Sequence, residues 1–137
     1  MKIPSPYERL AGCVWLPRIL AKARMIQRGE LPAAYAEMFC FPKGVDGFFL
    51  ANFGLDRPAV ERLAALPDAQ AEKEFLALAG KAGKSIEDWN HTALNLGRPG
   101  FPMADRLPIA KATKYQRVDS SAMTTVFEVL EADDQLG

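Results

Sequence analysis

The segment of residues 14–24 constrains the fold more than any other, because it combines a helix-starting proline, an apolar stripe and a basic stripe within eleven residues. Pro17 is tolerated in the first turn of a helix, where its missing N–H would have no intrahelical partner. Gly29 favours the left-handed conformation that ends a helix. The segment therefore predicts a helix over about residues 16–28.

This expected helix has two faces of different character. Arg18 and Lys22 are four residues apart and project together from one face. Two cations one turn apart repel unless an anion or carboxylates neutralise them, so the pair is a candidate contact for an anionic ligand. The alternative is a solvated face or an intramolecular ion pair. The other face is apolar and consists of Leu16, Ile19, Leu20, Ala23 and Ile26.

Signals for helix starts and stops continue along the chain, and no segment alternates apolar and polar residues as a half-buried strand does. Residues 30–42 fit a loop or a distorted helix, and residues 100–108 are mainly a proline-rich loop. We therefore expect an all-α fold, a single domain over residues 1–137 with about five or six short to medium helices. Further helices are expected over 47–53 after an Asp46 cap, after caps at Asp56 and Ser85, from Asp68 to the glycines at 80 and 83, and over 109–116 and 121–132.

Length and composition narrow the class of protein. A chain of 137 residues, 49% hydrophobic and 25% charged, is typical of one globular domain. No run approaches the ~18 apolar residues of a membrane span, and the first residues do not resemble a secretory leader, so we expect a cytoplasmic protein. Cys13 and Cys40 lack metal-ligand spacing and are interpreted as reduced, buried thiols. No metal or cofactor is expected.

Charge is distributed in blocks although the net charge is zero. Residues 1–30 and 81–117 are basic, whereas residues 31–80 and 118–137 are acidic. Alternating blocks favour attraction between segments of one fold, while nucleic-acid binding favours a strongly basic domain. Nucleic acid is therefore an unlikely partner, and the acidic end of the chain is interpreted as a frayed tail.

Aromatic residues are concentrated in residues 39–53, which hold five of the eight phenylalanines. They favour a core, the alternative being an interface or a ligand cavity. We expect a binding module for an anionic small molecule or a protein partner, with unknown oligomeric state. Its expected ligand-binding residues are Arg18, Lys22, Asp46, Trp15, Tyr35 and Phe49.

An enzyme is the alternative hypothesis. Asp46 would be its acid–base group, with a shifted pKa, and Arg18 or Lys22 its electrophilic partner. A solvent-reached cleft holding Asp46 beside those cations would favour catalysis, whereas an Asp46 bonded only to backbone N–H groups would argue against it. His91, the single histidine, falls outside the apolar stripe of its expected helix and should be exposed.

Several short motifs are distributed through most of the chain. They are Pro6-Tyr7-Glu8 with Gly12, Leu16-Pro17-Arg18, Lys22-Ala23-Arg24, Asp46 with Phe49, Gly54-Leu55-Asp56, and Trp89-Asn90. Together they resemble the bacterial family labelled domain of unknown function 5069. Val126 departs from the family at a position that is usually aromatic, within Thr125-Val126-Phe127-Glu128. The resemblance implies an intracellular helical single domain, and it carries no assigned activity or catalytic residues.

Overall fold

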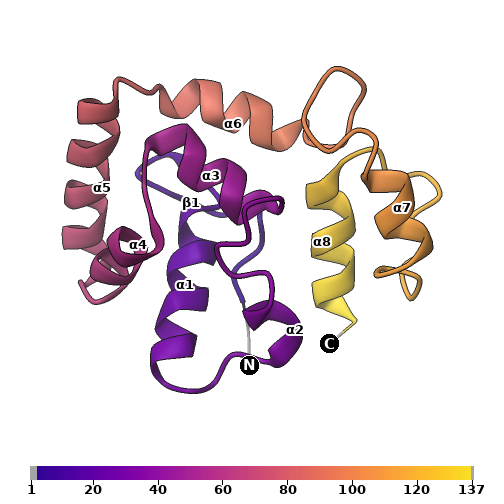
Figure 1. Cartoon of the computed structure of the whole chain (residues 1–137), viewed down its shortest axis with the longest axis horizontal. Coiled ribbons are helices and arrows are strands. Elements are labelled where there is room, and N and C mark those ends of the chain that lie inside the picture. The colour runs from indigo at the N-terminus through magenta and orange to yellow at the C-terminus, as the bar shows by residue number, and fades with distance from the viewer. Residues whose placement is uncertain (1–2, 137) are drawn as a thin grey trace.

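The protein is mostly helical, as a computed structural model describing residues 3–136 shows (Figure 1). Within that range it has eight helices and one two-stranded sheet. The strands are β1 (Arg9–Leu10) and β2 (Cys13–Val14), and the helices are α1 (Leu16–Gln27), α2 (Ala33–Ala36), α3 (Val45–Phe53), α4 (Arg57–Ala64), α5 (Asp68–Ala82), α6 (Ile86–Leu94), α7 (Leu107–Ala112) and α8 (Val126–Gln135).

The small sheet corrects the expectation of a strictly all-α fold. Arg9 pairs with Val14, and Leu10 pairs with Cys13, in an antiparallel hairpin. Gly12 closes the hairpin with a φ of 72°, in the left-handed region that glycine adopts without strain. Strands of two residues are too short to show alternation in the sequence, so this hairpin left no periodic signal.

Several helix boundaries confirm the capping signals. The side chain of Asp56 accepts a hydrogen bond from the Ala59 N–H at the start of α4, and Ser85 does the same for the Asp88 N–H in α6. The expected cap at Asp46 is wrong, because α3 begins at Val45, two residues before the expected start, and follows Gly44. This shift places Asp46 inside the first turn and frees its carboxylate for contacts with other elements.

The end of the chain also differs from expectation. Helix α8 starts at Val126, after a Thr125 cap whose partner Glu128 completes a capping box. It then continues through Asp133 and Asp134, which the sequence suggested were part of a frayed tail. Helix α7 begins at Leu107 and is shorter than the helix expected over residues 109–116.

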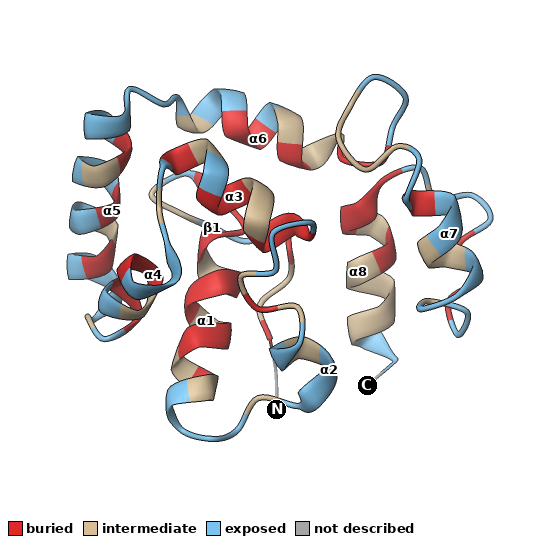
Figure 2. Cartoon of the chain, viewed as in Figure 1, coloured by how far each residue is buried: buried red, intermediate tan, exposed pale blue. Residues whose placement is uncertain are grey.

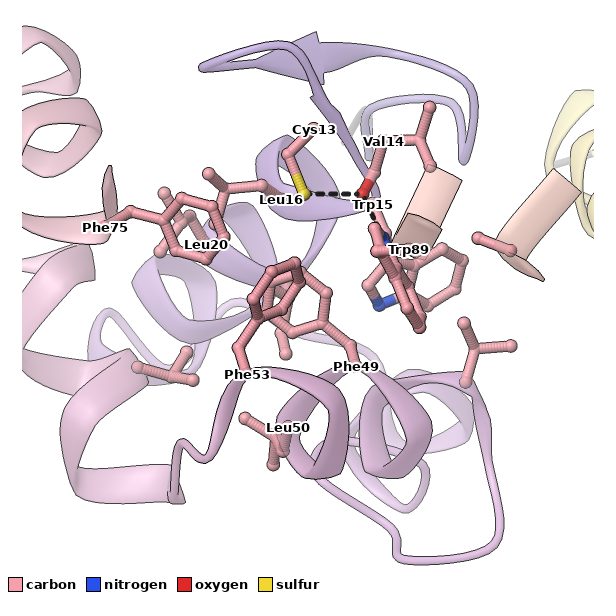
Figure 3. Packing of buried hydrophobic residues seen from close by; sticks show 14 of the residues in the cluster. Cys13, Val14, Trp15, Leu16, Leu20, Phe49, Leu50, Phe53, Phe75 and Trp89 are labelled. Carbon is pink, nitrogen blue, oxygen red and sulfur yellow. Dashed lines mark hydrogen bonds between the residues drawn. The ribbon is translucent and has the colours of Figure 1, made fainter. Parts of the chain in front are cut away.

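The core surrounds α1, which lies between α4 and α5 on one side and α7 and α8 on the other (Figure 1). Buried residues line the inner faces of these helices (Figure 2). Phe49 stacks on Phe75 with ring centroids 5.9 Å apart, and it meets Trp89 edge-on at 5.3 Å (Figure 3). Phe49 and Phe53 are therefore core residues, whereas Phe41 is 41% exposed. Within residues 3–136 no helix has the length and apolarity to cross a bilayer.

Candidate functional site

Helix α1 carries a second, polar face that is also buried. Trp15, Arg18 and Lys22 are spaced by three and four residues, so they follow one another along the same side of the helix. Arg18 is 3% exposed and Lys22 is 4% exposed. The guanidinium carbon of Arg18 lies 5.2 Å from the centre of the Trp15 ring, and Lys22 Nζ lies 5.0 Å from it. Both cations therefore interact with one indole.

The backbone of Trp15 is strained. Its φ of 76° is in the left-handed region, which costs a residue other than glycine about 1–3 kcal/mol. The surrounding contacts hold it there: its N–H donates to the Pro6 carbonyl, and its ring stacks on Phe127 at 5.4 Å. Trp15 immediately precedes α1, so this conformation turns the chain from β2 into the helix.

Asp46 is the common partner of Trp15 and Lys22. The indole Nε1 of Trp15 donates to Asp46 Oδ1 at 2.7 Å, and Lys22 Nζ lies 2.8 Å from both carboxylate oxygens. The backbone N–H of Cys40 donates to Oδ2 at 2.9 Å. Four contacts thus use the four acceptor positions of this 1% exposed carboxylate.

Close backbone packing brings Asp46 to this position. A Cβ atom on Gly47 would lie 2.2 Å from the carbonyl oxygen of Pro42, so only glycine allows α3 to start this near the preceding loop. Burial lowers the pKa of Lys22 from its ordinary value, and the Asp46 carboxylate partly offsets this effect.

Arg18 is paired with a carboxylate from the far end of the chain. Its Nη1 lies 2.5 Å from Asp134 Oδ2 and its Nη2 lies 3.3 Å from Oδ1, in a two-pronged contact. Nη1 also donates to the Pro4 carbonyl at 3.1 Å, and the Tyr35 hydroxyl donates to Asp134 Oδ1 at 3.1 Å. Burial first, and then the charge of Asp134, raise the pKa of Tyr35.

A cavity of about 1190 Å³ adjoins both ion pairs. Its walls come from α1, α2, the loop before α3, α7 and α8, and we name it the α1–α8 cavity. Apolar side chains line much of it, among them Leu107, Val126, Val129 and Leu130. Exposed cations stand around it at Lys43, Arg106, Lys114 and Arg117.

The cavity brings together five of the six residues expected to bind a ligand: Trp15, Arg18, Lys22, Tyr35 and Asp46. Phe49 is the exception, because it lies in the core and does not line the cavity. Arg18 and Lys22 do not form an exposed ridge, since α8 and α3 supply carboxylates that cover them.

Asp134 is the site residue that sequence reasoning missed. The signal was present in the acidic block at residues 118–137, which matches the basic block at residues 1–30. The ion pairs Arg18–Asp134 and Lys22–Asp46 each join a basic segment to an acidic one, as the charge pattern favoured.

The single histidine and the two cysteines add no further catalytic or metal-binding group to this site. His91 is exposed, as expected, and its ring meets Phe101. Cys13 is buried and Cys40 partly buried, and both are free thiols. Among residues 3–136, no group of three or more histidine, cysteine, aspartate or glutamate side chains is arranged to hold a metal ion.

Comparisons with known proteins identify a family. No curated protein and no solved structure matches the chain. The model of one family, described as a domain of unknown function (DUF5069), matches residues 1–136. That match extends over nearly the whole sequence and includes the motifs found near the hairpin, in α1 and around Asp46. The chain therefore belongs to the DUF5069 family.

Proposed function

We propose that this protein is a binding module for an anionic small molecule, which it takes up in the α1–α8 cavity. The observation that carries the proposal is the pair of buried cations, Arg18 and Lys22, beside one indole at the wall of that cavity. Ligand pockets commonly measure roughly 300–1,000 Å³ and combine apolar walls with a few convergent polar groups. The α1–α8 cavity, at about 1190 Å³, is somewhat larger than this range and has the same combination of apolar walls and convergent polar groups.

The energetics of buried charge support a role beyond stability. Moving an ion pair out of water costs several kcal/mol per ion, and apolar side chains of similar volume often stabilise a fold equally well. Trp15 adds about 1–3 kcal/mol of backbone strain at the same place. Strain and buried charge are commonly concentrated at ligand sites, where they fix polar groups in advance of binding.

The enzyme alternative receives less support. A general base needs a free lone pair, and the four acceptor positions of Asp46 are taken by Trp15, Lys22 and the Cys40 N–H. Asp46 is not a simple backbone cap either, since three of its four contacts come from side chains. This arrangement suits a group that orients Lys22 and Trp15. The concave shape of the cavity favours a small molecule over a protein partner.

A binding screen tests the proposal. Melting temperatures would be measured with a panel of carboxylates and phosphate monoesters, and hits titrated by calorimetry. Ala34 and Ala33 are adjacent exposed residues of α2, and of the two only Ala34 lines the cavity. Ala34→Trp should weaken binding of a hit by tenfold or more, whereas Ala33→Trp should leave it unchanged. The proposal fails if no panel anion binds, or if both variants bind as the native protein does.

A further inference from the structure

We propose that the ligand is a monocarboxylate with an apolar body, and that its carboxylate takes the position that Asp134 occupies on Arg18 and Tyr35. In this view Asp134 is an internal stand-in for the ligand. The inference rests on the proposed function and adds the chemical class of ligand and the residue that competes with it.

Arg18 and Tyr35, the donors that would receive the ligand carboxylate, are already in position, and Arg18 is buried. Arg18 presents Nη1 and Nη2 to the two oxygens of one carboxylate, and the Tyr35 hydroxyl donates to the same group. The guanidinium is planar and its two-pronged contact matches the planar carboxylate. Within residues 3–136, the buried Nε of Arg18 has no hydrogen-bond acceptor, so the guanidinium has further capacity to donate.

Asp134, the residue that occupies this site, is held there against nearby negative charge. Asp134 belongs to the last turn of α8, where the partial negative charge of the helix end disfavours a carboxylate. Asp133 adds a second negative charge beside it, and the exposed side chain of Arg117 is its salt-bridge partner. The Asp134 side chain is 18% exposed, against 3% for Arg18. Displacement by a ligand carboxylate would let the Asp134 side chain move away from these negative charges and into water, where they are screened.

Helix α8 can release its last turn without leaving the fold. Its first turns are anchored by the Thr125–Glu128 capping box and by the buried side chains of Val126, Phe127 and Val129. From Leu130 to Asp134 the residues are only partly buried, as the tan and blue end of α8 shows (Figure 2). Apolar anchoring is therefore concentrated at one end. The other end, with the carboxylate that must move, is held by polar contacts, among them the hydrogen bond from Ser5 Oγ to Glu131 Oε1 at 2.9 Å.

The rest of the lining selects the class of anion. Leu107, Val126, Val129 and Leu130 offer an apolar surface in the same cavity as Arg18. The exposed cations stand on other elements, whereas Glu131 and Asp133 line the cavity on α8, the helix that carries Asp134. At the Asp134 position their negative charges disfavour a doubly charged group such as a phosphate monoester. A single carboxylate on an apolar body fits both conditions.

Rescue of a variant by acetate tests the inference without knowledge of the natural ligand. Asp134→Ala should lower the melting temperature, and acetate should raise it again by at least ~2 °C more than sodium chloride at equal ionic strength. Asp133→Ala removes a neighbouring carboxylate that contacts Arg117 instead, and acetate should not rescue it. If Asp134→Ala does not fold, Asp134→Ser, whose shorter side chain also leaves the Arg18 contact open, serves in its place.

Titration of longer monocarboxylates gives the second readout. Hexanoate and benzoate should bind Asp134→Ala about tenfold or more tightly than the native protein, because an internal group that occupies a site nine-tenths of the time lowers apparent affinity by that factor. Both should also bind Asp134→Ala more tightly than acetate does. Equal rescue of Asp134→Ala and Asp133→Ala, or equal effects of phosphate and acetate, would overturn the inference.

The two proposals fail in different ways. If a panel anion binds the native protein and Asp134→Ala gains no affinity for monocarboxylates, the proposed function stands and the inference is wrong. If acetate rescues Asp134→Ala but no anion binds the native protein, both proposals are wrong, because no ligand then displaces Asp134 from Arg18 and Tyr35.

Discussion

Helix α1 has two buried faces that are held in place by different forces. On one face Leu16, Ile19 and Leu20 are at most 1% exposed and contact apolar neighbours. On the other, Arg18 and Lys22 are 3% and 4% exposed, and each needs a carboxylate delivered by a remote element. The comparison teaches that equal burial does not imply equal robustness. Many neighbours share the contacts of the apolar face, whereas each cation of the charged face has a single carboxylate partner.

The largest expected effect is in the apolar region. Phe49→Ala should lower the free energy of unfolding by about 3–5 kcal/mol, because it removes a fully buried ring that contacts Phe53, Phe75 and Trp89. Urea unfolding measures this loss. Phe41→Ala is the control, since that ring is 41% exposed and should cost less than ~1 kcal/mol. Similar losses in the two variants would contradict the assignment of Phe49 to the core.

The charged region should give the next effect. Arg18→Ala should lower the free energy of unfolding by about 3 kcal/mol. This is the lower end of the loss expected when a buried ion pair is broken, because the Asp134 side chain is 18% exposed and can partly regain contact with water. The matched control is Arg28→Ala. Arg28 and Glu30 are more than half exposed, so their pair should contribute less than ~1 kcal/mol. An Arg18→Ala protein as stable as Arg28→Ala would mean that the charged face is held by its apolar stems alone.

The smallest effect concerns pH. Burial raises the pKa of Cys13 to about 12 from an ordinary value of 9.0. The stability linked to this thiol is therefore fully present below pH 9 and is lost as pH rises toward 12. Between pH 9 and 11 the free energy of unfolding should fall more steeply in the native protein than in Cys13→Ala, by up to about 1.4 kcal/mol per pH unit.

Urea unfolding of both proteins at pH 8, 9 and 10 measures this difference. The pKa of Cys40, raised by burial to about 11, adds the same slope to both proteins, so subtraction isolates Cys13. Parallel pH profiles would show that Cys13 is not sealed in the apolar region.

Local signals were enough to predict most helices. Pro17 starts α1, and Asp56 and Ser85 cap α4 and α6, because these effects act within a single turn. The hairpin escaped prediction because its pairing depends on a distant residue. Asn90 accepts a hydrogen bond from the Val14 N–H and donates one to the Gly12 carbonyl, 76 and 78 residues away in sequence.

The site could be predicted only in part, for a similar reason. The spacing of Arg18 and Lys22 indicated a shared polar face, but helical periodicity does not reveal which other element covers that face. Asp134 lies 116 residues from Arg18, and the block pattern of charge showed only that such segments attract. Tyr35 and Trp15 were proposed on their side-chain chemistry, and they line the same cavity as the cations.

The peptide unit between Val14 and Trp15 has a mechanical consequence. Its carbonyl accepts from the Trp89 indole in the core, its N–H donates to Pro6, and the Trp15 side chain then holds Asp46. Figure 3 shows Val14 and Trp89 joined in this way. The α1 wall of the cavity is therefore fastened to the rigid centre of the molecule. Widening of the cavity therefore has to come from its other walls, α2, the loop before α3, α7 and α8. Under the proposed function, those walls would govern how fast a ligand enters and leaves, while α1 would govern how tightly it is held.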